Sequence, residues 1–213
     1  MLKSLHPLLA LSALVLAGLK DLPPLLASTW NLDIFCHELV TGFRHIVPEG
    51  PDHMALIIGL FFLSRTLPAL LIQTTLFTLA HSAMLGIVIF TGLEVPVRWV
   101  EIAVGLSIAA LAAESFLPGK LERWRPLTLL IFGGIHGLAF AHSLVQAQNI
   151  RSSPVSALFG FNLGIELGQL ALIGLLLLVF APWWKRVWYQ RRICQPVLLL
   201  ISLCGLHWAW ERW

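Results

Sequence analysis

The sequence is poor in charge and in cysteine, and both shortages narrow what the chain can be. Only 12% of its 213 residues are charged and 58% are hydrophobic, whereas about a quarter of a soluble domain is charged. A soluble fold cannot bury so much apolar surface, so the solvent must be a bilayer. Cys36, Cys194 and Cys204 form no CxxC pair, which argues against a disulfide framework and a structural zinc site.

Two further motifs are missing. The sequence contains no G-x-x-x-x-G-K-[ST] phosphate-binding loop, so any transport would draw on a gradient or a partner rather than on ATP bound here. The net charge is +3, but Lys and Arg gather in the loops between apolar segments without a nucleic-acid-binding pattern. We therefore expect no nucleic-acid partner and interpret the basic loops as signals of membrane topology.

The apolar segments predict an all-α fold, a polytopic transmembrane bundle of about six or seven spans in contact with the lipid bilayer. The predicted spans are 2–19, 51–64, 67–91, 96–115, 126–148, 154–182 and 193–211. The stretch near 30–47 is less apolar, and we expect an extra interfacial or re-entrant helix there.

The chain divides into an N-terminal span or signal-like segment over 1–27 and one transmembrane domain over 28–213. A retained first span fits the first segment better, because Leu26 makes a poor signal-peptide cleavage site. The basic loops at 120–125 and 185–192 are two spans apart and so share one face, which the positive-inside rule makes cytoplasmic. The N-terminus is then cytoplasmic and the C-terminus periplasmic.

Ionisable side chains at bilayer depth cost about 2.5–3.5 kcal/mol each on insertion scales, so they indicate a site or a pathway. The first group surrounds the turn before the second predicted span, where His45 precedes Asp52 and His53. Two imidazoles and a carboxylate around one turn can converge on a cation. The alternative is that Asp52 only caps the helix, where the dipole favours a carboxylate.

Five more polar side chains lie in the next three predicted spans. His81 and Ser82 belong to a polar stripe of the 67–91 span, for which interhelical hydrogen bonding is the alternative role. Glu101 begins the 96–115 span. His136 lies between Gly133 and Gly137, a spacing typical of a close helix contact. His142 follows on a different face.

The longest span carries Asn162, Glu166 and Gln169 at intervals of four and three residues, on one helix face. This stripe is consistent with a buried hydrogen-bond ladder or with a cation site. At about 1.5 Å per residue, most of the polar groups fall in the outer half of the bilayer, with His136 and Glu166 nearer its middle. Imidazole and carboxylate together suit nickel, cobalt, zinc or ferrous iron, and the near absence of sulfur ligands argues against copper(I).

Six stretches resemble the HupE/UreJ family of nickel permeases, a family of bacterial membranes. They are HIVPEGPDHMALIIGLFFLS (45–64), FTLAHSAML (77–85), EIAVGLSIAALAAE (101–114), FGGIHGLAFA (132–141), FNLGIELGQLAL (161–172) and GLHWAWER (205–212). They run in family order and cover roughly residues 40–212.

The resemblance implies a multi-pass protein of the bacterial inner membrane that imports nickel or cobalt for metalloenzyme assembly. It implies metal ligands at His45, Asp52, His53, His81, His136, Asn162 and Glu166, with Ser82 and Gln169 in support. From their positions in the predicted spans we add Glu101 and His142 as further supporting residues. The interval from His45 to Gly50 carries one residue more than is usual in the family, which raises the question of whether His45 reaches the site.

Three functions remain open at this stage. The first is a permease for a divalent transition-metal ion such as nickel, cobalt or zinc, bound within the membrane and open to the periplasm. The second is a membrane-embedded zinc-type hydrolase that uses the same cluster to activate water. The third is a non-catalytic role beside a metalloenzyme-maturation partner, and a homo-oligomer also remains open.

Overall fold

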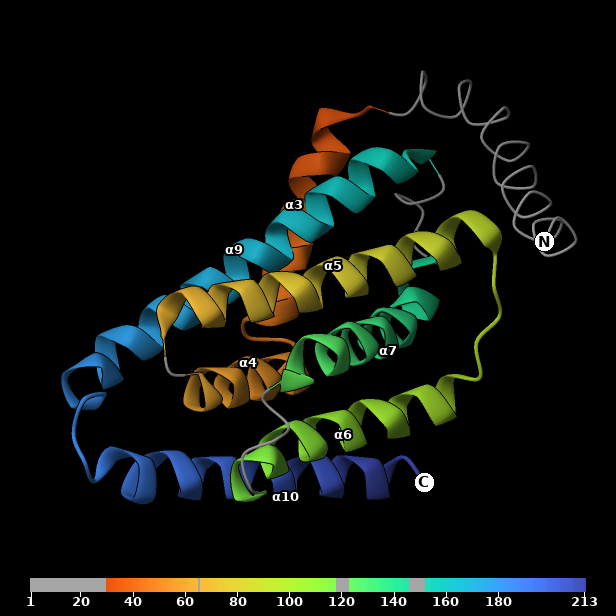
Figure 1. Ribbon diagram of the computed structural model, residues 1–213. Helices are drawn as coiled ribbons and strands as arrows, with labels where there is room; N and C mark the ends of the chain where they lie inside the picture. Colours follow the sequence, from red (N-terminus) through yellow and green to blue (C-terminus); the bar gives the residue numbers. More distant parts are fainter. Residues whose placement is uncertain (1–29, 65, 118–122, 146–151) are drawn as a thin grey trace, which may run out of the picture.

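The computed structural model describes residues 30–64, 66–117, 123–145 and 152–213; for residues 142–145 it describes the backbone only. All the regular secondary structure in this part of the chain is helical (Figure 1). Its α-helices are α3 (Leu32–Ile46), α4 (Pro51–Leu63), α5 (Leu67–Thr91), α6 (Val97–Ala113), α7 (Arg125–Val145), α9 (Pro154–Phe180) and α10 (Gln195–Glu211). Short helical turns η1 (Glu114–Phe116), η3 (Ala181–Trp183) and η4 (Gln190–Cys194) extend α6, α9 and α10.

Four of the described helical segments are long and apolar enough to cross a membrane, and the bent pair α3–α4 makes a fifth crossing if it counts as one span. The described apolar part of α7, Arg125–Ala141, is shorter. The predicted transmembrane helix bundle is therefore confirmed as a fold class. The predicted first span, 2–19, and the domain boundary after residue 27 lie outside the described residues.

The stretches predicted as an extra helix and as the second span form one bent unit. α3 and α4 meet at an angle of 65°, across the four residues that separate them. The Asn31 side chain caps α3 by accepting a hydrogen bond from the Ile34 N–H (3.1 Å), and α4 starts at Pro51, whose missing N–H would have no helical partner there. The chain bends here because α3 ends at Ile46 and a new helix, α4, begins at Pro51.

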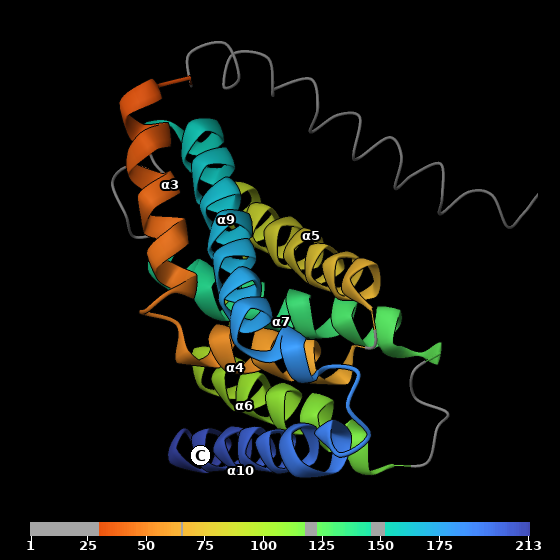
Figure 2. The same cartoon turned by 90° about the vertical axis from the view of Figure 1, so that its left-hand side faces the viewer.

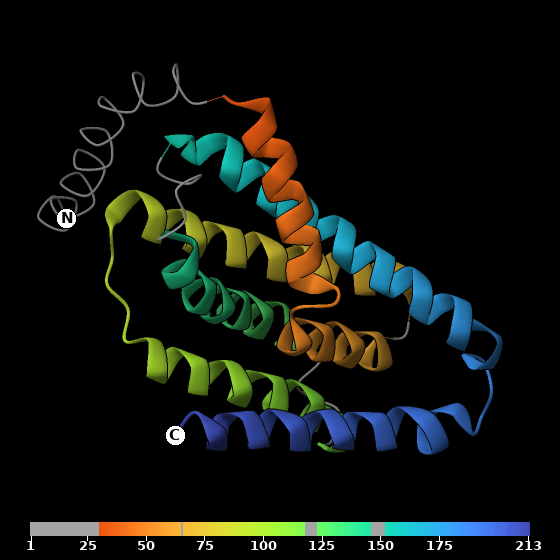
Figure 3. The same ribbon diagram turned by 180° about the vertical axis from the view of Figure 1, so that it is seen from behind.

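Glycines join the helices into three close pairs (Figures 1 and 3). A Cβ at Gly160 or Gly164 of α9 would overlap the backbone of α3, at Phe35 and Leu39. The predicted close contact at Gly133 and Gly137 of α7 is confirmed, because a Cβ there would meet the backbone of α5. Gly105 of α6 and Gly205 of α10 face each other in the same way. Lipid offers no hydrophobic drive between helices, so close backbone approach is what stabilises such pairs.

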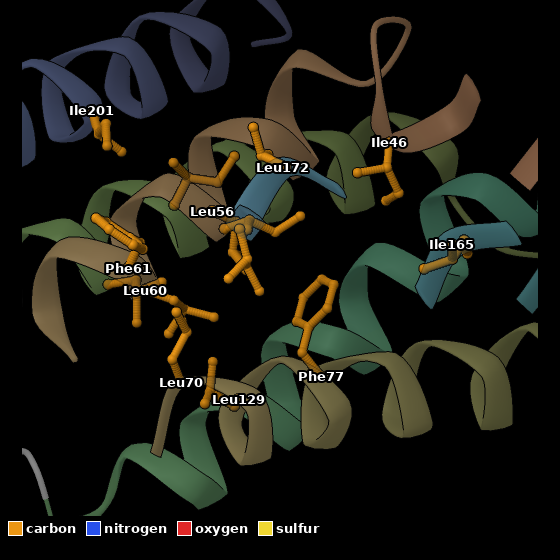
Figure 4. Close-up of a cluster of buried hydrophobic side chains, with 14 of the residues drawn as sticks. Ile46, Leu56, Leu60, Phe61, Leu70, Phe77, Leu129, Ile165, Leu172 and Ile201 are labelled. Carbon is orange, nitrogen blue, oxygen red and sulfur yellow. The ribbon is translucent and has the colours of Figure 1, made fainter. Parts of the chain in front are cut away.

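The order of these contacts along the chain shows how the helices of each pair run relative to each other. α3 runs parallel to α9 and α5 runs parallel to α7, whereas α6 and α10 are antiparallel. α4 lies in the interior between the pairs (Figures 1 and 2). Leu56, Leu60 and Phe61 of α4 are at most 1% exposed and pack among residues of the other helices (Figure 4). A helix that is apolar all round is a buried one, so α4 is the core of the bundle.

Candidate metal centre

Three histidines from three helices converge at the bend between α3 and α4. One ligand nitrogen from each of His45, His53 and His81 lies within 4.8 Å of the others. His45 is near the end of α3, His53 near the start of α4 and His81 in the middle of α5. The ring centroids of His45 and His53 are 4.5 Å apart, and those of His53 and His81 are 5.5 Å apart. His45 therefore reaches the cluster despite the extra residue before Gly50.

A fourth imidazole borders this cluster. The ring of His136 on α7 lies 5.0 Å from that of His53 between centroids. It comes close because Gly137 packs directly on the backbone of His81 and brings α7 against α5. His53, His81 and His136 are 4%, 1% and 1% exposed, so the cluster is shielded from solvent.

A hydrogen bond from His53 to Asp52 uses one ring nitrogen of His53 and leaves the other, Nε2, as a free lone pair. Its Nδ1 lies 3.2 Å from Oδ1 of Asp52. A carboxylate only accepts, so Nδ1 carries the proton and donates. The Nε2 atom then holds a bare lone pair, and it is buried without a hydrogen-bond partner. A carboxylate behind an imidazole in this manner is the usual second partner of a metal-binding histidine.

His136 is oriented by a hydroxyl instead of a carboxylate. Ser107 on α6 donates its single proton to the Val104 carbonyl (2.7 Å). Its oxygen must therefore accept from the Nε2–H of His136, 3.0 Å away. Nδ1 of His136 is left as a buried lone pair without a partner.

The remaining two histidines also present unpaired nitrogens. Nε2 of His45 and both ring nitrogens of His81 are buried without a hydrogen-bond partner. Leaving a buried polar atom unsatisfied costs about 1–3 kcal/mol, and four imidazoles here bear that cost side by side. A Lewis acid with borderline softness satisfies such lone pairs, so the donor set fits a divalent transition metal.

Aromatic side chains enclose the cluster. Phe140 and Phe161 stack with an interplanar angle of 6°, and the His45 ring lies 4.0 Å from Phe140 between centroids. Phe77 contacts both His81 and His136. These rings restrict the imidazole rotamers and exclude water, which sharpens the geometry of the ligand nitrogens.

A small cavity of about 130 Å³ opens beside the cluster. Its lining includes His45, His53 and His136 together with Asp52, Glu101 and Arg212. Glu101, near the start of α6, is thus part of the lining of this cavity, and its role there stays a prediction. His142 is in α7, but its side chain is outside the described part of the structure.

The polar stripe of α9 meets α5 rather than the cavity. Ser82 donates to Asn162 Oδ1. Thr75 donates to Glu166 Oε1 (3.3 Å), and Gln169 donates to the Thr78 hydroxyl (2.8 Å). Asn162, Glu166 and Gln169 are absent from the cavity lining and from the three-histidine group. In this structure they form hydrogen bonds between α9 and α5, one of them with Ser82. Such a hydrogen-bond ladder was the alternative to a cation site in the sequence analysis.

Two residues of the site were not singled out from the sequence. Ser107 is a lone hydroxyl in an apolar helix, and its polarity was a usable signal. Arg212 follows a tryptophan-rich helix end, which predicts a headgroup-level residue rather than one in the cavity. Only the antiparallel pairing of α10 with α6 brings Arg212 beside Glu101.

A second, larger cavity of about 520 Å³ lies at the other end of α4. Ser64 follows α4 and lines it, together with Glu114, Arg125, Arg186 and Cys194. Arg125 donates to Glu114 through Nε and Nη2, with a shortest distance of 2.6 Å. Arg125 and Arg186 come from the two basic loop regions predicted to share a face, and this common lining agrees with that prediction.

The apolar spans and the buried imidazole cluster define a multi-pass helical membrane protein with a candidate metal centre inside it. The family model described as HupE / UreJ protein matches residues 25–212, so the chain belongs to the HupE/UreJ family. Comparison with curated proteins and with solved structures gave no match.

Proposed function

We propose that the chain is a permease for a divalent transition-metal ion, nickel or cobalt above all, which it binds within the membrane. The observation that carries this proposal is the group of three histidines, His45, His53 and His81, whose ligand nitrogens gather at the helix break with the His136 ring beside them, each imidazole having a buried nitrogen without a hydrogen-bond partner. Imidazole suits nickel, cobalt and zinc, whereas magnesium and calcium prefer an all-oxygen site. The lining of the small cavity contains no cysteine or methionine among the described residues, which disfavours copper(I).

The two cavities support transport over retention of the ion. The small one borders the histidines at the start of α4, and the large one borders the end of the same helix. Between them, Leu56 and Leu60 fill the interior. An ion admitted on the first side would leave on the second once α4 shifted against its neighbours. The two-cavity arrangement is what alternating access requires.

We place the protein in the bacterial inner membrane with the large cavity facing the cytoplasm, the N-terminus cytoplasmic and the C-terminus periplasmic. Support comes from the basic residues that follow α9, one of which, Arg186, lines that cavity; they are Lys185, Arg186, Arg191 and Arg192. An ion released there would be available to a metalloenzyme-maturation partner.

The first test is metal binding by the purified, detergent-solubilised chain. Elemental analysis comes first, followed by calorimetric titration with Ni²⁺, Co²⁺ and Zn²⁺. We expect His53→Gln and His81→Gln to weaken binding by at least about 100-fold, since each removes a ligand, and Asp52→Asn by roughly 10–100-fold, as is usual for an outer partner.

The matched control is His207→Gln. His207 is exposed on α10 and pairs with Glu211 (3.4 Å), away from the cavity lining, so its replacement should leave affinity unchanged. Wild-type affinity in both the His53 and His81 variants would refute the site. Uptake of Ni²⁺ and Co²⁺ into vesicles, lost in the same variants, then tests transport itself.

One observation favours the hydrolase alternative. Three imidazoles beside a carboxylate and an open cavity are the donor set of a hydrolytic zinc centre, and Glu101 supplies a carboxylate at that cavity. A zinc ion retained through purification, with no metal uptake by vesicles, would favour the enzyme over the permease.

A further inference from the structure

Arg212 brings a permanent positive charge to the lining of the small cavity. It caps the C-terminal end of α10, and its Nη1 donates to the backbone carbonyl of Glu101 (3.3 Å). In turn, the Arg98 side chain donates to the Arg212 carbonyl (3.4 Å). The first contact holds the guanidinium at the cavity that His45, His53 and His136 also line, whereas the second holds only the Arg212 backbone at the helix end.

This charge is not cancelled by a salt bridge. Within the described part of the chain, the ion pairs are His37–Glu38, His53–Asp52, Arg125–Glu114 and His207–Glu211, and Arg212 takes part in none of them. A guanidinium stays protonated at every physiological pH. An arriving metal ion is therefore repelled by the positive charge of Arg212. A site selected only for tight metal binding would not contain such a charge.

The carboxylates of the same cavity explain what this cation can do. Asp52 and Glu101 both line it, and in the absence of metal their two negative charges face a single opposite charge. The side chain of Arg212 is long and flexible and is only partly buried. Its guanidinium donates to the Glu101 backbone and forms no ion pair with either carboxylate, so it acts on both charges across the cavity and can withdraw toward the solvent when a metal ion arrives.

We propose that Arg212 is a tethered competitor cation, which balances Asp52 and Glu101 in the empty site and is displaced by the incoming divalent ion. This inference rests on the proposed metal transport. Its consequence is a site whose affinity is held down, so that the ion is released again. It also favours divalent over monovalent cations, because displacing one fixed positive charge requires an ion that brings more than one.

The test compares Arg212→Gln, Arg212→Lys and wild type by titration of the full chain in detergent with Ni²⁺. Removing the cation that competes with the ion for Asp52 and Glu101 should tighten binding by roughly 10–100-fold at the effective dielectric of a partly buried site. The Ni²⁺ dissociation rate should fall in proportion. Arg212→Lys keeps the charge and should bind within about threefold of wild type.

The control is Arg98→Gln, which removes a different hydrogen bond between the ends of α6 and α10, at a residue that does not line the cavity. It should leave Ni²⁺ affinity unchanged. Equal tightening in Arg98→Gln would assign the effect to a loosened helix end and overturn the proposal, and so would unchanged or weaker binding by Arg212→Gln.

The outcomes separate this inference from the proposed function. Binding by wild type with no tightening in Arg212→Gln refutes the competitor role alone. No binding by wild type but measurable binding by Arg212→Gln supports it strongly. Absence of Ni²⁺ binding in both chains refutes the metal site and the competitor role together.

Discussion

Two buried histidines of the cluster have a hydrogen-bond partner that decides which of their nitrogens stays available. Asp52 provides that partner for His53, and Ser107 provides it for His136. Because Ser107 spends its only proton on the Val104 carbonyl, it can only accept from the imidazole. A single hydroxyl thereby selects the tautomer that leaves Nδ1 of His136 unprotonated, as a buried lone pair.

Replacing Ser107 by alanine should weaken Ni²⁺ binding by about 10–100-fold, the usual effect of losing an outer partner of a metal-binding histidine. Ser107→Thr keeps the hydroxyl and should restore most of the affinity. Calorimetric titration of both variants measures the effect, and thermal unfolding reports whether the fold is intact.

Ser202→Ala is the matched control, because Ser202 on α10 also bonds a backbone carbonyl, that of Ala109, but contacts no histidine. Its affinity should equal that of wild type. If Ser107→Ala binds Ni²⁺ as tightly as Ser202→Ala, the hydroxyl does not orient His136 for the metal.

At this scale the sequence predicted the histidines well and their partners poorly. His45, Asp52, His53, His81 and His136 could be proposed because ionisable groups are conspicuous in apolar helices. The stripe of Asn162, Glu166 and Gln169 gave the same signal, yet its hydrogen bonds run to hydroxyls of α5. A polar stripe predicts that a helix face is not lipid-facing, but it does not say which neighbour the face meets.

Among the helices, the α3–α9 pair determines where His45 lies. Gly164 of α9 faces the backbone of Leu39 and Phe43, six and two residues before His45. Any side chain at this glycine would push α3 outward and carry His45 away from His53 and His81. The packing of one glycine is therefore coupled to the geometry of the site.

Gly164→Ala should destabilise the protein by about 1–3 kcal/mol, the usual cost of overpacking, and should also weaken Ni²⁺ binding. Gly174→Ala on the same helix is the control, since nothing lies within 4 Å of a Cβ there, and it should be neutral or slightly stabilising. Thermal unfolding in detergent and titration distinguish the two. Equal behaviour of both variants would contradict the close contact.

The helix boundaries were largely predictable, whereas the partners of each helix were not. The prediction of 67–91 matches α5, and 154–182 overlaps α9 to within two residues. Apolar length sets where a span begins and ends. Which helices pair depends on which small residues face each other, and the bend at 46–51 depends on a helix restart that hydropathy does not register.

For the whole molecule, the positions of the two cavities predict opposite accessibility. In a chain in which Cys36, Cys194 and Cys204 are replaced by serine, Ser115→Cys should react with a membrane-impermeant thiol reagent only from the cytoplasmic side, because Ser115 lines the large cavity. Glu94→Cys, in the exposed loop between α5 and α6, should react only from the periplasmic side.

Inside-out and right-side-out vesicles measure the two cases separately. Labelling of both cysteines from one side would contradict the proposed orientation of the bundle. Reaction of both from either side would instead indicate a continuous opening through the protein, which a permease with alternating access does not have.

The broken helix also dictates an order of biogenesis. With 15 and 13 residues, α3 and α4 reach only about 22 and 20 Å along their axes, short of the roughly 30 Å hydrocarbon core. Neither half can leave the insertion machinery as an independent spanning segment. α3 finds its packing partner only when α9, made much later, has entered the membrane. His45 is then held against His53 only after α9 has been made, so the proposed metal site is completed late in synthesis.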